Sequence, residues 1–191
     1  MKKVHIIILL SLLNLSCELF TTRDPEEPDT PRSNYQVATT PEILLQNLID
    51  AFQDKNAENY MYCFVDSSYS EKVFLFQPSA SAGSQYPFLR SWNLQSEKQY
   101  FINLTNSIES SSAIVLLLTN EEKSLQGDSL TYIASYVLNV PTSSEQLPKY
   151  YQGKLSFTMV RDSRSQWVIT TWQDIQEESN FSWSDLKGRY Y

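Results

Sequence analysis

The feature that most constrains the fold is a change in hydrophobic periodicity near residue 110. Upstream, apolar residues recur at helical spacing, and they lie at Leu44, Leu45, Leu48, Ile49 and Phe52 and again at Phe101, Leu104 and Ile108. From Ser112 onward the chain is rich in β-branched and aromatic residues separated by turn-forming residues, which indicates strands. Helices followed by a run of strands predict an α+β domain, with helices on one face of a mainly antiparallel sheet.

Local signals place the predicted helices. Thr40 and Pro41 have the residue types favoured at the N-cap and first position of a helix, and the helical pattern continues through Asp54. A second, short helix is predicted from Asn56 to Phe64. Ser96–Gln99 fits a capping box, which predicts the start of a third helix.

The strand signals define most of the predicted sheet. The β-prone run Val73–Gln77 precedes Pro78–Pro87, a predicted loop rich in Ser, Ala and Gly. Near the end of the chain, Ser182–Lys187 predicts one closing helical turn that Gly188 terminates. The remaining strands are predicted at Ser112–Thr119, Ser129–Val140, Gly153–Arg161 and Gln166–Asp174.

The chain opens with a segment that predicts export. Lys2 and Lys3 precede the apolar run Val4–Leu15, which is too short to span a bilayer because a spanning helix needs about 20 residues. The run matches the apolar region of a secretory signal peptide. The pair Ser16–Cys17 resembles the lipobox of bacterial lipoproteins, although Asn14 and Leu15 depart from its usual pattern. The resemblance implies cleavage before Cys17 and lipidation of its thiol.

This interpretation divides the chain into a signal peptide at 1–16, a tether at 17–37 and a domain at 38–191. The tether alternates proline with charge and lacks periodicity, so we expect an extended, solvated segment. The expected location is the bacterial cell envelope, anchored to the bilayer through Cys17, with the outer membrane favoured over the inner. A plain secreted protein and an uncleaved signal anchor remain the alternatives.

Charge and cysteine content restrict the partners. The formal net charge is −7 and becomes −9 once Lys2 and Lys3 are removed with the signal peptide. An acidic protein repels phosphate backbones, so we expect no nucleic-acid partner. A lipidated Cys17 leaves Cys63 without a disulfide partner. Cys63 lies among apolar residues, and we interpret it as a small buried hydrophobic residue.

The element order and several local patterns resemble the NTF2-like (SnoaL-like) superfamily. The resemblance rests on the helix at Pro41–Phe52, the short helix at Asn56–Tyr60 and the strand Trp167–Trp172 followed by Asp174, and it covers residues 41–174. It implies a cone in which a strongly bent sheet wraps about three helices. Members of this superfamily include both enzymes and binding proteins, so the fold alone does not define the function.

The sequence offers no recognisable catalytic set. The single histidine, His5, lies in the predicted signal peptide, which argues against triads and histidine-based metal sites in the mature chain. We therefore predict no catalytic residue, metal or cofactor. One alternative is an isomerase or hydratase that uses a Tyr/Asp acid–base pair in the cone, with Asp66 and Asp174 as acids near predicted element ends.

Aromatic residues are the most distinctive component of the predicted domain. They fit ordinary core packing or the lining of an apolar cavity, and Trp172 shares a face with Trp167 only if a β-bulge intervenes. We predict a non-enzymatic domain that binds an envelope protein partner or a small apolar ligand, with a structural homodimer through the sheet as a further alternative. The candidate pocket-lining residues are Phe64, Phe74, Phe76, Trp92, Phe101, Tyr132, Tyr136, Phe157 and Trp167.

Overall fold

The computed structural model describes residues 34–177 and 181–191, which belong to one compact unit, Ser33–Tyr191. The predicted signal peptide, Cys17 and most of the predicted tether lie outside the described residues. The elements are α2 (Pro41–Gln53), α3 (Ala57–Met61), β1 (Leu75–Gln77), α4 (Ala80–Gln85), the 3-10 helix η1 (Pro87–Ser91), α5 (Leu94–Asn106), β2 (Val115–Gln126), β3 (Ser129–Asn139), β4 (Tyr150–Arg161), β5 (Trp167–Gln176) and α6 (Trp183–Tyr190).

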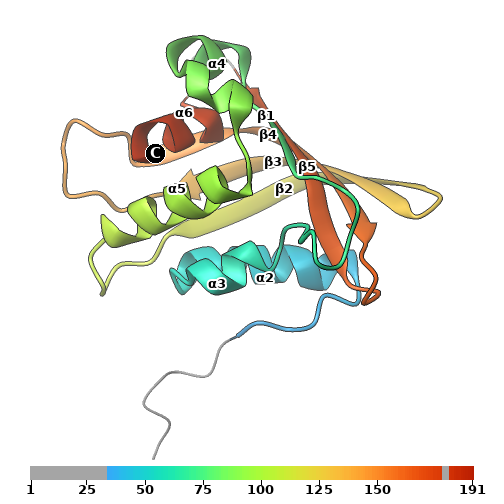
Figure 1. Ribbon diagram of the computed structural model, residues 1–191. Coiled ribbons are helices and arrows are strands. Elements are labelled where there is room, and N and C mark those ends of the chain that lie inside the picture. The colour runs from blue at the N-terminus through green and yellow to red at the C-terminus, as the bar shows by residue number, and fades with distance from the viewer. Residues whose placement is uncertain (1–33, 178–180) are drawn as a thin grey trace, which may run out of the picture. The chain divides into compact units, whose positions relative to one another are not determined.

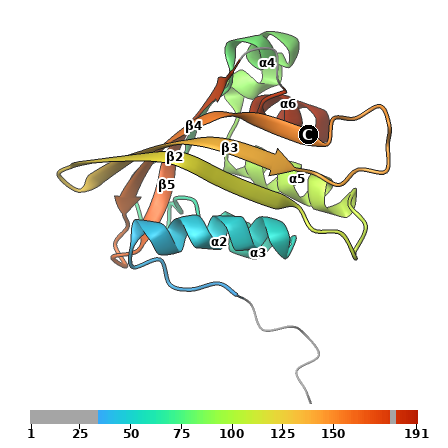
Figure 2. The ribbon, with the colours of Figure 1, turned by 180° about the vertical axis from the view of Figure 1, so that it is seen from behind.

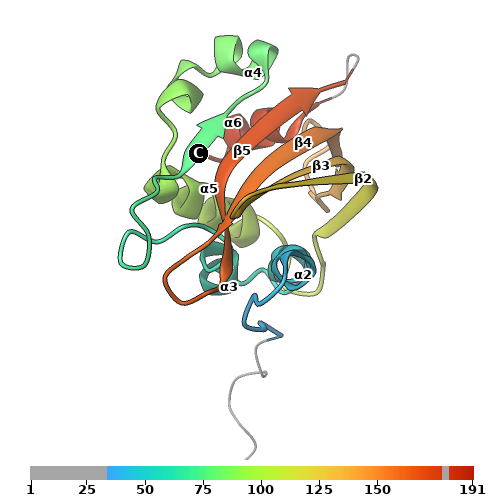
Figure 3. The ribbon, with the colours of Figure 1, turned by 90° about the vertical axis from the view of Figure 1, so that its right-hand side faces the viewer.

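The strands form one five-stranded sheet in the order β1-β5-β4-β3-β2. Strands β2 to β5 pair antiparallel with their neighbours, whereas β1 runs parallel to β5 and makes the sheet mixed. Figures 1 and 3 show the twisted sheet curving around the helices, with α2, α5 and α6 on its concave side. The predicted α+β class with a mainly antiparallel bent sheet is confirmed.

Strand β3 shows why the sheet buries one face. Its side chains alternate between inward and outward positions, as the period of a strand requires, and the buried ones are Leu130, Tyr132, Ala134, Tyr136 and Leu138. A tight turn joins β2 to β3, and Gly127 in this turn has a φ of 60°, a conformation that glycine adopts without strain. The β2–β3 hairpin projects past the neighbouring strands (Figure 2).

A β-bulge in β5 brings Trp167 and Trp172 to the same face of the strand. Thr158 pairs with Thr171 and the next residue, Met159, pairs with Ile169, so β5 contains one extra residue at this point. The extra residue lets both Trp167 and Trp172 face the core, where they are 6% and 0% exposed. The interior therefore receives both bulky side chains from a single strand.

Two of the predicted helix starts are confirmed. The Thr40 hydroxyl accepts a hydrogen bond from the Ile43 amide at the start of α2, and Asn56 accepts bonds from the amides of Glu58 and Asn59 at the start of α3. Both side chains satisfy backbone donors that the first turn of a helix leaves without partners.

Other local predictions were wrong. The capping residue of α5 is Asn93, which accepts bonds from the amides of Gln95 and Ser96. Gln99, which would close the predicted box, instead donates to Asn103 Oδ1. The predicted loop 78–87 contains α4 and leads into η1. Strand β2 continues past Thr119 to Gln126, and α6 continues through Gly188 to Tyr190.

The segment before α2 already packs against the domain. The Gln36 amide donates to Asn47 Oδ1 at 3.0 Å, Asn47 Nδ2 donates to the Gln36 carbonyl at 2.6 Å, and the Trp167 amide donates to the Ala38 carbonyl at 2.8 Å. Contacts with the domain therefore begin before residue 38. None of the helices within 34–177 and 181–191 is long and apolar enough to cross a membrane.

Candidate functional site

The space between the bent sheet and the helices is filled by the C-terminal helix. Helix α6 inserts Trp183, Leu186 and Lys187 among the core residues, and all three side chains are 0% exposed. Trp183 packs edge-to-face on Trp172 with 4.6 Å between the ring centroids. The interior that could form a ligand cavity in a fold of this shape is thus occupied by side chains of the chain itself.

A buried ion pair lies at the centre of this filled interior. The Lys187 ammonium lies 2.5 Å from Glu97 Oε2, and both side chains are fully buried. Glu97 also accepts hydrogen bonds of 2.6 Å from the Tyr60 hydroxyl and the Trp92 indole nitrogen. These additional donors satisfy the buried carboxylate, which an ion pair in the interior requires.

Aromatic rings surround the ammonium of Lys187. The Nζ atom lies 3.7 Å from the ring centroid of Trp172 and 3.9 Å from that of Phe76, distances at which a cation is attracted to the face of a ring. Burial nevertheless lowers the pKa of Lys187 to about 8, although the neighbouring Glu97 opposes the shift.

A second buried network contains the Tyr/Asp combination that the isomerase alternative requires. The Tyr136 hydroxyl donates to Asp174 Oδ1 at 2.7 Å, and Asp174 is 2% exposed. Asp174 Oδ2 accepts bonds from the amide and hydroxyl of Ser184, while the Tyr136 oxygen accepts from the Trp183 amide. Burial raises the pKa of Asp174, against the opposing effect of these hydrogen bonds. Tyr136 and Asp174 are therefore both hydrogen-bonded to the first turn of α6.

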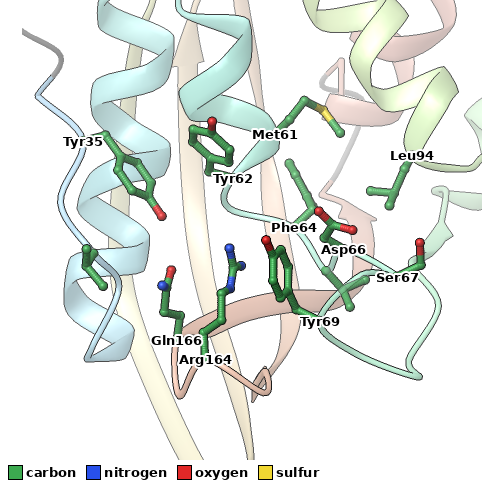
Figure 4. Close-up of a pocket in the computed structure, with 12 residues that line it drawn as sticks. Tyr35, Met61, Tyr62, Phe64, Asp66, Ser67, Tyr69, Leu94, Arg164 and Gln166 are labelled. Atoms are coloured by element: carbon green, nitrogen blue, oxygen red, sulfur yellow. The ribbon is translucent and has the colours of Figure 1, made fainter.

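An open cleft lies around the C-terminal end of α3. It has a volume of about 530 Å³, within the range of small-molecule sites. Figure 4 shows its walls, which come from the segment before α2, the end of α3, the connection to β1 and the β4–β5 turn. The lining residues are Tyr35, Val37, Met61, Tyr62, Phe64, Val65, Asp66, Ser67, Tyr69, Leu94, Arg164 and Gln166.

The β4–β5 turn holds Arg164 in a fixed orientation at this cleft. Asp162 Oδ2 lies 2.8 Å from Arg164 Nε and 2.7 Å from its Nη2, a two-point contact that restricts the planar guanidinium. Asp162 Oδ1 accepts bonds from the amides of Arg164 and Gln166 and thereby shapes the turn. The ring of Tyr69 stacks on the guanidinium, with its centroid 3.7 Å from Cζ.

The opposite wall of the cleft carries two further tyrosines. The rings of Tyr35 and Tyr62 lie 5.3 Å apart and are tilted by 55°. The Tyr62 hydroxyl donates to Glu58 at 2.6 Å, which raises the pKa of Tyr62, and burial raises the pKa of Tyr35. Both phenols therefore stay neutral at physiological pH. By contrast, the backbone amide of Ser68 donates to Asp66 and lowers the pKa of that carboxyl group.

Two neighbouring hollows extend this cleft, and Leu94 lines all three spaces. One hollow, of about 510 Å³, runs along α5 past Lys98 and Ile102. The other, of about 310 Å³, follows the segment that leads to β1, past Lys72 and Val73. The three spaces adjoin one another at Leu94, and we call them together the Leu94 groove.

The aromatic residues predicted to line an apolar pocket are all buried. Phe64 borders the central cleft and Phe74 borders the hollow toward β1. Phe76 and Trp92 contact Lys187. The others pack in the core between sheet and helices, and they are Phe101, Tyr132, Tyr136, Phe157 and Trp167.

Sequence reasoning missed the exposed residues of the central cleft. Tyr62 and Tyr69 are 46% and 39% exposed, which is unusual for large aromatic side chains, and Arg164 lies in a segment interpreted only as a turn. The one available signal was the presence of tyrosines in polar stretches outside the periodic segments. The described residues contain no group of three or more His, Cys, Asp or Glu side chains arranged to hold a metal ion.

Comparison with solved structures defines the class of fold as NTF2-like. The structure aligns with a candidate dehydratase of the NTF2-like family from Streptomyces avermitilis at a TM-score of 0.56 and 9% identity, covering 74% of this chain and 96% of that one. It also aligns with an NTF2-like superfamily protein from Salmonella enterica serovar Typhimurium at a TM-score of 0.50 and 10% identity, covering 68% and 83% of the two chains.

A third similar structure is a candidate calcium/calmodulin-dependent protein kinase type II association domain from Thiobacillus denitrificans. Its TM-score is 0.50 and its identity 10%, with 75% of this chain and 99% of that chain covered. The sequence matches no protein-family model, and no curated protein is similar enough to match. At these identities the similarity establishes the fold, and the function must be argued from the site.

Proposed function

We propose that the protein is an exported, lipid-anchored envelope protein whose NTF2-like domain binds a partner molecule in the Leu94 groove and catalyses no reaction. The observation that supports a surface site is the filled interior, where Lys187 and Trp183 occupy the space available for a ligand. The groove instead offers exposed tyrosines beside a fixed guanidinium, a combination of apolar faces and a few polar groups typical of binding sites.

The isomerase or hydratase alternative has less support. Its acid–base pair would be Tyr136 and Asp174, but both groups are buried and hydrogen-bonded to the start of α6. A substrate would have to displace that helix before it reached either group. Catalysis in the interior would thus require loss of the Lys187–Glu97 pair as well.

Mass analysis tests the proposed anchor. Protein purified from membranes should begin at Cys17 and carry the added mass of a diacylglyceryl group and a fatty acid, since stable anchoring needs more than one acyl chain. Replacement of Cys17 by alanine should release the protein from the membrane fraction. Cleavage at another position, or a Cys17→Ala protein that stays membrane-bound, would contradict lipidation.

Photocrosslinking in intact cells tests the binding surface. A photoreactive residue at Tyr62, which lines the groove, should capture a partner, whereas the same residue at Tyr150 should not. Tyr150 is a suitable control because it is 60% exposed, pairs with Asn139 of β3 and lines none of the three hollows. Capture from neither position would contradict the proposed binding function.

The same experiment addresses the homodimer alternative. Val115 and Leu117 are exposed on the outer sheet face, and Val115 lies in the same cross-strand row as Asn139 and Tyr150. A crosslink from Tyr150 to a second copy of the chain, without capture from Tyr62, would favour a structural dimer over binding in the Leu94 groove.

A further inference from the structure

We propose that the ligand of the Leu94 groove is a neutral, linear oligosaccharide. This inference deepens the proposed function and rests on it, because it assigns a chemical class to the molecule bound at the same surface. A sugar ring has an apolar face formed by its C–H groups and an edge formed by hydroxyl groups. A complementary site must therefore combine exposed aromatic faces with polar side chains that both donate and accept hydrogen bonds.

The central cleft supplies the aromatic component. Tyr62 and Tyr69 project from different segments, and both remain substantially exposed although each contacts another side chain. Tyrosine suits this role because it has a large rigid surface with a polar tip and few rotatable bonds to immobilise. In Figure 4 the ring of Tyr62 lies on one side of the cleft and that of Tyr69 on the other.

The polar component points into the same space. Figure 4 shows the ends of Arg164, Gln166 and Tyr69 directed toward the middle of the cleft. Asp162 engages Nε and Nη2 of Arg164 and leaves Nη1 outside that ion pair. Within 34–177 and 181–191, Nη1, the Gln166 side-chain amide and the Tyr69 hydroxyl have no hydrogen-bond partner, so all three can bind hydroxyl groups.

Charge favours a neutral ligand. Asp162 neutralises the guanidinium of Arg164, and Asp66 adds a negative charge to the central cleft. Lys72 and Lys98 lie only in the flanking hollows, and the whole chain is acidic. A polyanion would find no net positive charge at the centre of the groove, and the overall field would repel it.

Backbone pairing favours a sugar over an extended peptide. A peptide that adds to a sheet needs an open strand edge, but the cleft wall is already bonded: the Val65 amide donates to the Ile169 carbonyl and the Ser163 amide to the Tyr69 carbonyl. Recognition at this wall must therefore use side chains. The three hollows adjoin at Leu94, and such a row of neighbouring spaces suits a chain of sugar units rather than a single one.

Calorimetric titration of the full mature chain tests the proposal. The protein is kept in a detergent without a sugar headgroup and titrated with three tetrasaccharides: β-1,4-linked N-acetylglucosamine, β-1,4-linked glucose and α-1,4-linked glucose. At least one should bind with one-to-one stoichiometry. Tyr69→Ala and Arg164→Ala should each weaken that binding about tenfold or more, because each removes a ligand contact and loosens its stacked neighbour.

Matched controls separate binding from folding. Tyr150→Ala removes a more exposed tyrosine that does not line the groove and should bind the sugar like the parent protein. The melting temperatures of the Tyr69→Ala and Tyr150→Ala variants should agree with that of the parent protein within a few degrees, because both side chains are exposed. Arg164→Ala also leaves the buried Asp162 without its cation, so its titration is carried out well below its own melting temperature. Absence of binding by all three tetrasaccharides overturns the proposal, as does sugar binding that the Tyr69 and Arg164 variants retain in full.

The outcome also separates this inference from the proposed function. Capture of a protein from Tyr62 in cells, combined with no sugar binding in solution, overturns the oligosaccharide and leaves a groove that binds a protein. Failure of both experiments contradicts the binding function itself.

Discussion

The ammonium of Lys187 and the carboxylate of Glu97 form the most consequential pair of residues in the domain. A buried pair of this kind adds modest net stability, because removing both charges from water costs about as much as their attraction returns. Removal of only one of the two charged groups is far more damaging, because the other charge is then left buried without a partner.

A double-mutant cycle at this pair should show strong coupling. Glu97→Gln and Lys187→Met should each lower the free energy of unfolding by about 3–5 kcal/mol, whereas the double variant should lose less than the sum of the two. Urea unfolding followed by circular dichroism measures all three values. Single variants that cost less than about 1 kcal/mol would show that the pair is not buried in solution.

The depressed pKa of Lys187 makes stability depend on pH. The pKa is about 8 in the folded protein and about 10.4 in an unfolded chain. Between these values the unfolded chain binds more protons, so the free energy of unfolding rises with pH. The rise from this residue is limited to about 3 kcal/mol, because one pKa unit corresponds to about 1.4 kcal/mol.

We therefore expect the wild-type protein to gain stability between about pH 8 and pH 10 relative to the Glu97→Gln/Lys187→Met variant. Urea unfolding at each pH gives the comparison, and a constant difference across the range would contradict it. The range ends there because burial raises the pKa of Tyr60 and Tyr100. At higher pH these phenols ionise on unfolding and oppose the trend in both proteins.

Helix α6 shows at the level of elements how packing overrides local signals. Gly188 was expected to end the helix, since glycine is a common terminator. Instead the helix continues, and a Cβ at position 188 would collide with the ring of Tyr86. The glycine is required for the close approach of α6 to this tyrosine.

Gly188→Ala should therefore destabilise the domain by about 1–3 kcal/mol, the usual cost of overpacking, although alanine favours helix by about 1 kcal/mol. Gly83→Ala is the matched control, because a Cβ there would lie 3.3 Å from Pro78 Cγ and meet no aromatic ring. Thermal unfolding should show a lower melting temperature only for the position 188 variant. An unchanged or raised melting temperature at position 188 would contradict this account of the α6 packing.

The elements that sequence reasoning located were those with strong periodicity or caps, such as α2 with Thr40 and the strands β3 to β5. Those it missed lack both signals. Helix α4 is built from Ala, Ser and Gly without an apolar stripe, and α5 begins one turn earlier than Ser96 suggests. The parallel pairing of β1 depends on contacts between residues 75–77 and 171–173, about a hundred positions apart.

At the scale of the whole molecule, the order of helices and strands, together with local patterns such as Trp167–Trp172, predicted the NTF2-like fold. These features did not predict whether its interior is open. Whether the interior is open depends on Lys187 and Glu97. A sequence alone would place both residues on the surface, because charged side chains are mostly exposed. The binding cleft was equally hidden, because Tyr35, Tyr69 and Arg164 come from segments far apart in the chain. Tertiary contact, rather than local pattern, brings these residues together.

Shortened chains test where the folded unit begins. A chain that starts at Asn34 should unfold at the same temperature as the longer protein. One that starts at Thr40 should lose about 2–4 kcal/mol, because Asn47 and the Trp167 amide lose partners and an unsatisfied buried group costs about 1–3 kcal/mol. Equal stability of the two shortened chains would place the boundary after residue 38.

Helix α6 makes the completed core depend on residues that follow the whole sheet in the sequence. The counter-charge of Glu97 and the tryptophan at the centre of the core both come from this helix, after the last strand. A chain without α6 would retain a buried carboxylate without its cation and a cone open to water. The helices and strands that precede Trp183 therefore cannot close the interior by themselves.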